Sequence, residues 1–323
     1  MNSIFLQLLA DRNGIPAGLV LASAPDAAHA DWPVTVAQPL AQLAAKFPCH
    51  YRQGLAEPSA LPLRQAGWIE LCPGRALRAD RPFDKDLPGH VAWIEGDWAL
   101  VPPCRPTGNQ AASRALALQL VQLVNADADT HEIEDLLRRD PTLSYHLLRL
   151  VNSLRAGAGR KVTSFSQAIL ILGRQQLRRW LNLMLFAARA GDMRSAMLLA
   201  RVSVRARLME LLARATGLDK HNQEQAFMTG MFSLLGVLFG TPLAEVLAPL
   251  ALGDAVQRAL LAQQGELGAL LALVEEAERG EFASVAAALE AVQLPAAQFN
   301  ALVAEANLWM LAVTGDVTGR AHA

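Results

Sequence analysis

The stretch that decides the fold is RDPTLSYHLLRLVNS, residues 139–153. Asp140 suits the position just before a helix, because its carboxylate can accept hydrogen bonds from the free amides of the first turn. Pro141 suits the next position, since the N–H that it lacks would have had no helical partner there. Apolar residues then recur at helical spacing, so the sequence predicts a helix over Thr142–Asn152.

Helical patterns continue along the chain beyond this stretch. Ser164 and Gln167 form a capping box before an apolar run that Gly173 interrupts. Further helices are predicted at Gln175–Ala190, Met193–Thr216, Gln223–Phe239, Leu243–Leu250, Asp254–Ala262, Leu267–Arg279, Phe282–Ala291 and Ala296–Val313. A hydrophobic share of 52% with 18% charged residues indicates a large folded core and excludes a disordered chain.

Residues 1–108 differ in composition from the rest. They hold all three cysteines, four of the six tryptophans and most of the 17 prolines. Short apolar runs between Gly and Pro predict strands at Ser3–Leu9, Gly18–Ala22, Trp68–Leu71, His90–Ile94 and Trp98–Val101, a hairpin turn at Ile94–Trp98 and a helix near Val36–Lys46. The breaker-rich segment PPCRPTG, residues 102–108, ends this region. We therefore predict a mainly α protein, with a small α/β domain at 1–108 and a helical domain at 109–318.

The cysteines and the N-terminal residues indicate in which cellular compartment the protein works. Cys49, Cys72 and Cys104 are odd in number and widely spaced, so they indicate neither a disulfide framework nor a zinc site. The N-terminus lacks the basic region and apolar stretch of a signal peptide, and no apolar run is long enough for a membrane span. We expect a cytoplasmic protein without a bound metal or cofactor.

Charge is unevenly distributed along the chain, although the net charge is −1. Residues 138–214 hold 15 Lys and Arg against 3 Asp and Glu, whereas residues 215–323 hold 4 against 12. The basic block could face a phosphate-bearing molecule or an acidic protein. Alternatively, its arginines face the acidic final third inside one domain. No zinc finger, recognition helix or aromatic RNA-binding pattern is present, so a nucleic acid is not indicated.

The stretch at 139–153 and its sequel resemble the signature of the HDOD family. The matching positions are Asp140, Pro141, Leu148, Asn152, Ser153, Ser164, Ala168, Leu172, Gly173 and Trp180. The match in order and spacing covers some forty residues, and a weaker similarity continues to about Val313. The resemblance implies a compact helical bundle of the HD superfamily that acts in bacterial signalling, most similar to the branch in which an EAL domain comes first.

The same resemblance places the metal-binding helix of HD phosphohydrolases at residues 230–237. That helix reads GLLHDIGK in the family and GMFSLLGV here, so Ser233 stands in place of His, Leu234 in place of Asp and Val237 in place of Lys. Since leucine cannot bind a metal ion, the resemblance implies a degenerate site without hydrolytic activity.

The N-terminal third resembles EAL domains only in its opening strand and turn, around FLQ at 5–7 and DRNG at 11–14. Val20 stands where the catalytic Glu of that family belongs. A complete eight-stranded barrel needs about 200–250 residues, and 108 precede the helical region. A truncated EAL remnant and an unrelated small α/β domain both fit this sequence.

Three functions follow as hypotheses. The first is a non-catalytic signalling adaptor that contacts a protein partner. The second is a sensor that binds a cyclic dinucleotide or another nucleotide without hydrolysing it. The third is a metal-dependent phosphodiesterase. A basic face could serve either of the first two, and its candidate residues are Arg149, Arg155, Arg160, Arg174, Arg178 and Arg179.

Overall fold

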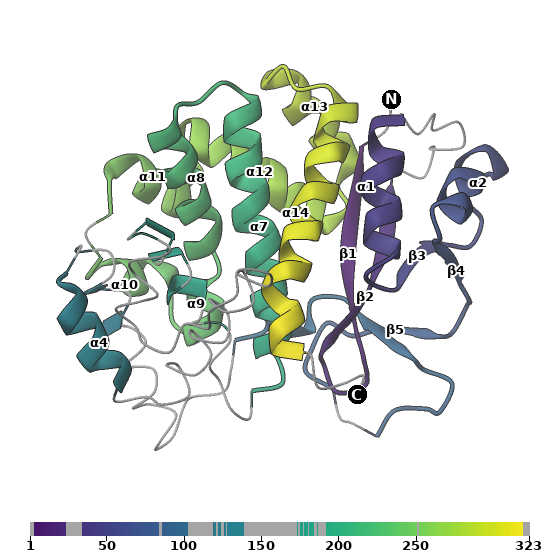
Figure 1. Cartoon of the computed structure of the whole chain (residues 1–323), viewed down its shortest axis with the longest axis horizontal. Coiled ribbons are helices and arrows are strands. Elements are labelled where there is room, and N and C mark those ends of the chain that lie inside the picture. The colour runs from purple at the N-terminus through teal and green to yellow at the C-terminus, as the bar shows by residue number, and fades with distance from the viewer. Residues whose placement is uncertain are drawn as a thin grey trace, which may run out of the picture.

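The computed structural model describes residues 3–23, 34–83, 86–102, 119–120, 122–123, 126, 128–138, 173, 175–176, 178–179, 181–183, 186, 192–250 and 252–318. Most of the described helices lie on one side of the molecule, and a six-stranded sheet lies on the other (Figure 1). This arrangement confirms the predicted class, mainly α with a smaller N-terminal α/β part.

The sheet contains six short strands in the order β4-β3-β2-β1-β6-β5. Their bounds are β1 Ile4–Ala10, β2 Pro16–Ser23, β3 Cys49–Arg52, β4 Ile69–Leu71, β5 Ala76–Arg78 and β6 Trp93–Glu95. Strand β1 runs antiparallel to both of its neighbours, and the other adjacent pairs are parallel. The carboxyl ends of the other five strands therefore lie at one edge of the sheet.

The sheet is strongly curled. Its two outermost strands, β4 and β5, are joined by residues 72–75 alone. In a flat sheet they would lie about 24 Å apart, at roughly 4.8 Å per strand, whereas the five residue steps from Leu71 to Ala76 span at most about 18 Å. The rings of His50 on β3 and Trp93 on β6 lie 5.0 Å apart between centroids, although two strands separate them. The sheet thus folds around an interior.

Successive side chains along the strands point alternately into this interior and into the main core. Leu9, Val20 and Leu71 form a small buried cluster inside, with Ala76 and Trp93 packed against it. Their sequence neighbours on the opposite face join the main core, which is continuous from the sheet to the helices. Because successive side chains in a strand point to opposite faces, the interior face continues at every second residue.

The described helices are α1 Val34–Ala44, α2 Glu57–Gln65, α4 Thr130–Arg138, α7 Ser195–Ala215, α8 Lys220–Phe232, α9 Leu235–Phe239, α10 Leu243–Leu247, α11 Asp254–Ala262, α12 Gly265–Arg279, α13 Phe282–Ala291 and α14 Ala296–Thr318. The long helix α7 is the centre of the bundle, where α8, α12 and α14 pack against it. The predicted helices from Met193 to Val313 are confirmed, apart from the break described below.

The helices and the sheet are directly joined. Helix α14 packs against both β1 and α1, and it lies between the sheet and the rest of the bundle (Figure 1). The backbone N–H of Ile4 donates to Oδ1 of Asn300, at 2.8 Å. Arg201 on α7 forms an ion pair with Asp97, at 2.8 Å. The predicted domain boundary near residue 108 lies outside the described residues, so the division at 108/109 stays a prediction.

Three predicted elements are wrong. Trp98–Leu100 is a short 3-10 helix, not a strand, and the chain at Ile94–Trp98 makes no hairpin. Gly96 there has φ 100°, and the N–H of Trp98 donates to the carbonyl of Ala79, which turns the chain inward. The predicted helix Gln223–Phe239 is split between α8 and α9.

Two strands and one helix were not predicted. Strand β3 has four residues, of which His50 and Arg52 are polar on the interior face, so it lacks the apolar alternation that indicates a strand. Strand β5 has only three residues. Helix α2 contains Pro58 and Pro62, which in a sequence indicate a loop.

Gly230 allows the close approach of α7 and α8. A Cβ at this position would lie 2.8 Å from Cα of Ala206 and 2.9 Å from the carbonyl oxygen of Arg205. Since both are backbone atoms, Gly230→Ala must push the two helices apart. We expect a loss of about 1–3 kcal/mol in the free energy of unfolding, although alanine favours a helix by about 1 kcal/mol over glycine. Urea unfolding measures the loss. Gly89→Ala is the control, because no atom lies within 4 Å of its Cβ.

Candidate functional site

Ser233, at the position that the resemblance gives to a metal-binding His, lies in the gap between α8 and α9. Its hydroxyl donates to the carbonyl oxygen of Gly230, at 2.7 Å, and accepts a hydrogen bond from Nη1 of Arg205, at 2.8 Å. A serine that bonds the preceding helical turn competes with the helix backbone. This competition explains why the predicted long helix breaks here.

Arg205 on α7 is the cation of a buried cluster at this position. Its side chain is 6% exposed and bonds two carboxylates of α12. Nε and Nη2 bind the two oxygens of Glu278, at 2.9 and 2.6 Å, and Nη1 binds Glu275, at 3.2 Å. Burial by itself lowers the pKa of Arg205, but Glu278 and Glu275 outweigh it and the pKa is raised. The guanidinium therefore stays charged.

The residues at this position do not fit a catalytic metal ion. Both hydrogen-bonding roles of the Ser233 hydroxyl are used, and Leu234 is buried at 3% exposure. Val237 is apolar and packs against the core. Glu275 and Glu278, the nearby carboxylates, already neutralise Arg205. Across the described part of the chain, no group of three or more His, Cys, Asp or Glu side chains could hold a metal ion.

Arg179 occupies a second cluster of this kind. Its side chain is 12% exposed and contacts Glu210 on α7 and Glu224 on α8. Nη2 lies 2.9 Å from Glu210, Nε lies 2.7 Å from Glu224, and the guanidinium stacks 4.3 Å from the ring centre of Phe227. Burial opposes the charge on Arg179, but the two glutamates raise its pKa. Arg179 is therefore an internal ion-pair partner and not part of a free basic face.

Two further arginines of the basic block also pair with a carboxylate of the final third. Arg207 bonds Glu305 at 2.8 Å, and Arg214 lies 3.7 Å from the same carboxylate. Together with Arg179 and Arg205, these pairs confirm that arginines of the basic block face the acidic final third. Arg178 is half-buried. Arg149, Arg155, Arg160 and Arg174 lie outside the described residues.

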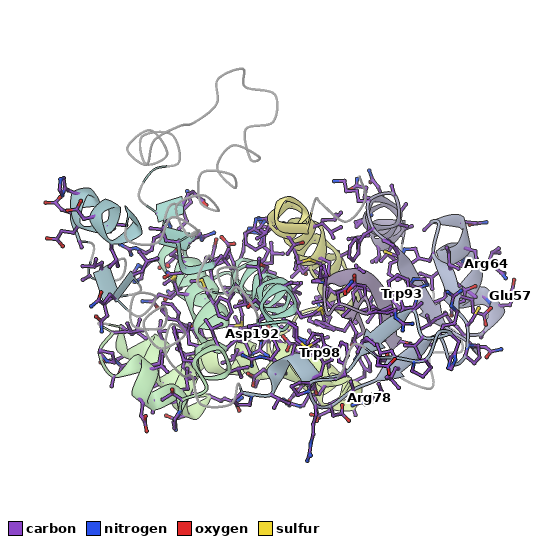
Figure 2. The ribbon with its side chains drawn as sticks, turned by 90° about the horizontal axis from the view of Figure 1, so that it is seen from below. Glu57, Arg64, Arg78, Trp93, Trp98 and Asp192 are labelled. Atoms are coloured by element: carbon purple, nitrogen blue, oxygen red, sulfur yellow. The ribbon has the colours of Figure 1, made fainter. Side chains whose placement is uncertain are left out.

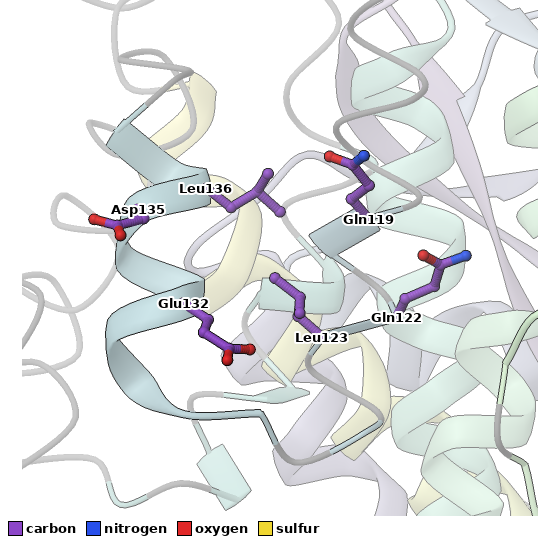
Figure 3. Close-up of a pocket in the computed structure, with 6 residues that line it drawn as sticks. All are labelled: Gln119, Gln122, Leu123, Glu132, Asp135 and Leu136. Carbon is purple, nitrogen blue, oxygen red and sulfur yellow. The ribbon is translucent and has the colours of Figure 1, made fainter.

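A surface pocket of about 430 Å³ lies beside α4. Leu136 and Glu132 project from α4 toward the segment that carries Gln119, Gln122 and Leu123, whereas Asp135 points away (Figure 3). The described lining residues are two amides, two carboxylates and two leucines, and the two carboxylates do not belong to a group of three or more side chains that could hold a metal ion. This pocket carries no chemistry by itself.

Nine of the ten positions that resemble the HDOD signature lie outside the residues that the structure describes. Gly173 alone among them is described, and its φ of 74° is the left-handed conformation that glycine favours. Asp140, Pro141, Leu148, Asn152, Ser153, Ser164, Ala168, Leu172 and Trp180 lie outside the described residues. Their local roles stay predictions.

The sequence did contain a signal for the Arg205 cluster. Leu198, Val202, Met209 and Leu212 are fully buried on α7, and Arg205 continues their spacing of three and four residues. A charge on the buried face of a helix needs a partner, and two carboxylates three residues apart on one helix supply it. The charge count by segment does not show this pattern, because it sums the arginines of residues 138–214 without regard to the helix face on which each one lies.

Sequence comparison supports this picture of the helical part. The profile of the HDOD domain matches residues 113–272. This chain contains an HDOD domain. The match includes α7, α8 and the first half of α12, and with them Arg205, Ser233 and the Arg179 cluster, whereas Glu275 and Glu278 lie just beyond it.

Two curated relatives match about half of the chain each. The cyclic di-GMP phosphodiesterase CdgJ of Vibrio cholerae is 34% identical over 171 residues, which are 53% of this chain and 39% of CdgJ. The uncharacterized protein YuxH of Bacillus subtilis is 31% identical over 158 residues, 48% of this chain and 38% of YuxH. The matched region thus spans about two fifths of either relative.

Two solved structures are similar at lower identity. A putative phosphohydrolase from Shewanella amazonensis SB2B has a TM-score of 0.45 at 16% identity, covering 63% of this chain and 93% of its own. An HDOD domain protein of unknown function from Geobacter sulfurreducens has a TM-score of 0.35 at 20% identity, covering 54% and 72%. These likenesses carry no functional conclusion. Among the described helices, none is long and apolar enough to cross a membrane.

Proposed function

We propose that this protein is a non-catalytic component of cyclic di-GMP signalling, whose HDOD domain acts by contacting a protein partner in the cytoplasm. The observation that carries the proposal is the Arg205 cluster. An arginine bonded to Ser233, Glu275 and Glu278 lies at the position that the resemblance assigns to the metal-binding His of HD phosphohydrolases. Without a metal to activate water and neutralise phosphate charge, this chemistry has no catalyst.

The relatives support a role in cyclic di-GMP signalling but do not establish whether this chain has phosphodiesterase activity. CdgJ is named a cyclic di-GMP phosphodiesterase and is 34% identical to this chain over 171 residues. Three fifths of CdgJ have no counterpart in that match. The phosphodiesterase activity in its name is therefore an alternative for this chain and not the proposal itself.

The proposal includes an N-terminal region descended from an EAL domain. A strand, a turn and a second strand, β1 and β2, occupy the residues that resemble the opening of that domain. Val20, which the resemblance aligns with the catalytic glutamate, is fully buried inside the curled sheet. An apolar side chain there offers no carboxylate to a metal ion, which supports a remnant without phosphodiesterase activity.

The decisive experiment is a hydrolysis assay with cyclic di-GMP in the presence of Mg²⁺ and Mn²⁺. We expect no linear product above a mock purification, and no stoichiometric metal in the purified protein by elemental analysis. Turnover that exceeds the mock purification and scales with protein concentration would overturn the proposal in favour of the phosphodiesterase.

The sensor alternative is distinguished by calorimetry. Saturable binding of cyclic di-GMP without turnover would make this protein a sensor, which the name of CdgJ makes worth testing. Absence of heat leaves the protein-contact function in place.

A further inference from the structure

A cavity of about 540 Å³ opens at the edge of the curled sheet where its parallel strands end. We call it the sheet mouth. It is lined by Ser23 at the end of β2, by Arg52 at the end of β3 and Gly54 beyond it, by Arg78 of β5 and by Glu95 of β6. Gly280 and Phe282, where α12 gives way to α13, complete its wall. The carboxyl edge of parallel strands is the usual place of ligand sites in α/β proteins.

Strand alternation supplies the mouth with polar groups. Arg52, Arg78 and Glu95 each follow an interior residue, His50, Ala76 or Trp93, by two positions. They therefore continue the interior face outward from the apolar layer. Figure 2 shows Arg78 and Trp93 at the sheet end of the molecule. His50 apart, the side chains of the interior face are thus apolar deep in the sheet and charged where the interior opens to solvent.

Arg52 is held across the mouth by neighbours from other strands. Its Nη2 lies 2.6 Å from Oε2 of Glu95 and 3.4 Å from Oε1 of Gln7 on β1. Glu95 is only 15% exposed, yet Arg52 remains 48% exposed despite these bonds. A carboxylate that fixes one edge of a guanidinium leaves its remaining N–H donors oriented for a ligand. Arg78, which is 69% exposed and pairs through Nε with Asp80 at 3.3 Å, adds a second guanidinium to the same cavity.

His50 lies two residues before Arg52 on the interior face of β3, where its ring packs against that of Trp93. It is 8% exposed, and neither ring nitrogen forms a hydrogen bond of good geometry. Burial lowers its pKa and the charge of Arg75 acts in the same direction, whereas the nearby backbone of Ile69 opposes them. A neutral imidazole with free nitrogens is costly in a core whose other interior residues are apolar. A buried side chain with unsatisfied hydrogen-bonding atoms, close to a polar cavity, is a feature of many binding sites.

We propose that the sheet mouth binds a small molecule that carries a phosphate or carboxylate group, up to the size of a mononucleotide. Arg52 and Arg78 contact the anionic oxygens, because guanidinium groups bind both kinds of oxyanion through paired N–H donors. Glu95 positions Arg52. The volume lies within the range of about 300–1,000 Å³ that is common for small-molecule sites. The site goes beyond the proposed function and does not depend on it.

The test is isothermal titration of the whole protein with four probes. Inorganic phosphate and 5′-GMP carry a phosphate, citrate carries carboxylates, and guanosine is the uncharged counterpart of 5′-GMP. We expect saturable binding, one molecule per chain, of either the phosphates or citrate, and at least about tenfold weaker binding of guanosine than of 5′-GMP if phosphates are preferred.

Two variants locate the binding. Arg78→Gln, which removes an exposed side chain, and Arg52→Gln are each expected to weaken binding by about tenfold or more. Arg64→Gln is the matched control, because Arg64 lies on neighbouring α2, is 46% exposed and pairs with Glu57 away from the cavity lining (Figure 2). It should bind as the parent does. The proposal is overturned if no anion binds, or if Arg78→Gln and Arg52→Gln bind as tightly as Arg64→Gln.

Discussion

Arg205→Met is expected to reduce the free energy of unfolding by about 3–5 kcal/mol. Methionine fills similar space on α7 but leaves Glu275 and Glu278 without the cation that neutralises them. Glu278 is 11% exposed, so its charge cannot be recovered fully by water. Removal of one partner from a buried ion pair costs more than the pair contributed, because the remaining charge stays desolvated. Urea unfolding followed by tryptophan fluorescence measures the loss.

Two further variants separate charge from packing at Arg205. Arg214→Met removes a 55% exposed arginine from the same helix and should change stability by no more than about 0.5 kcal/mol. The double variant Arg205→Met with Glu278→Met removes both charges and should recover a large part of the loss. A single variant as stable as the parent, or a double variant less stable than the single one, would contradict the assigned role of the cluster.

Arg179→Glu is expected to cost a similar amount, about 3–5 kcal/mol. The change places a third carboxylate beside Glu210 and Glu224, which are 15% and 18% exposed, and removes the cation over the ring of Phe227. Like charges in such a site repel strongly because solvent screens them poorly. The midpoint of thermal unfolding should fall accordingly. Arg258→Glu on the exposed side of α11 is the control and should change stability by at most about 0.5 kcal/mol.

This expectation changes how a basic binding face can be tested. Charge reversal at Arg179 would weaken partner binding simply because the helical bundle loosens. A partner-binding assay is informative only with variants that retain the parent's unfolding midpoint. If Arg179→Glu proves as stable as Arg258→Glu, then Arg179 is available to a partner after all.

The sequence predicted the described helices from α7 onward well because their signals are local, whereas the predicted helix at Thr142–Asn152 lies outside the described residues and that at Gln175–Ala190 is described only in part. Asp254–Ala262 and Phe282–Ala291 were predicted with their observed bounds, since each is a short apolar pattern between clear breaks. The break at Ser233 could not be read from the pattern, because it depends on the side-chain bonds that Ser233 makes to Gly230 and with Arg205 from another helix. The curl of the sheet is likewise non-local, since β3 and β5 are too short to give a pattern and are fixed by their strand neighbours.

The candidate sites show the same contrast between what local sequence indicates and what depends on contacts between distant residues. The family resemblance implies the loss of a His-Asp pair at Ser233 and Leu234, whereas the ion pairs of Arg205 beside Ser233 became evident only in space. The sheet mouth was not predicted, because Gln7, Arg52, Arg78 and Glu95 come from four strands that are far apart in the sequence.

The bond between Ile4 and Asn300 has a consequence for the order of folding during synthesis. The two residues are 296 positions apart, and α14 covers both β1 and α1. The first strand leaves the ribosome long before the helix that buries its outer face has been made. Contacts of such long range are slow to form, and the exposed apolar strand is meanwhile open to association with other chains. We infer that the N-terminal part reaches its final state only after the last helix is released.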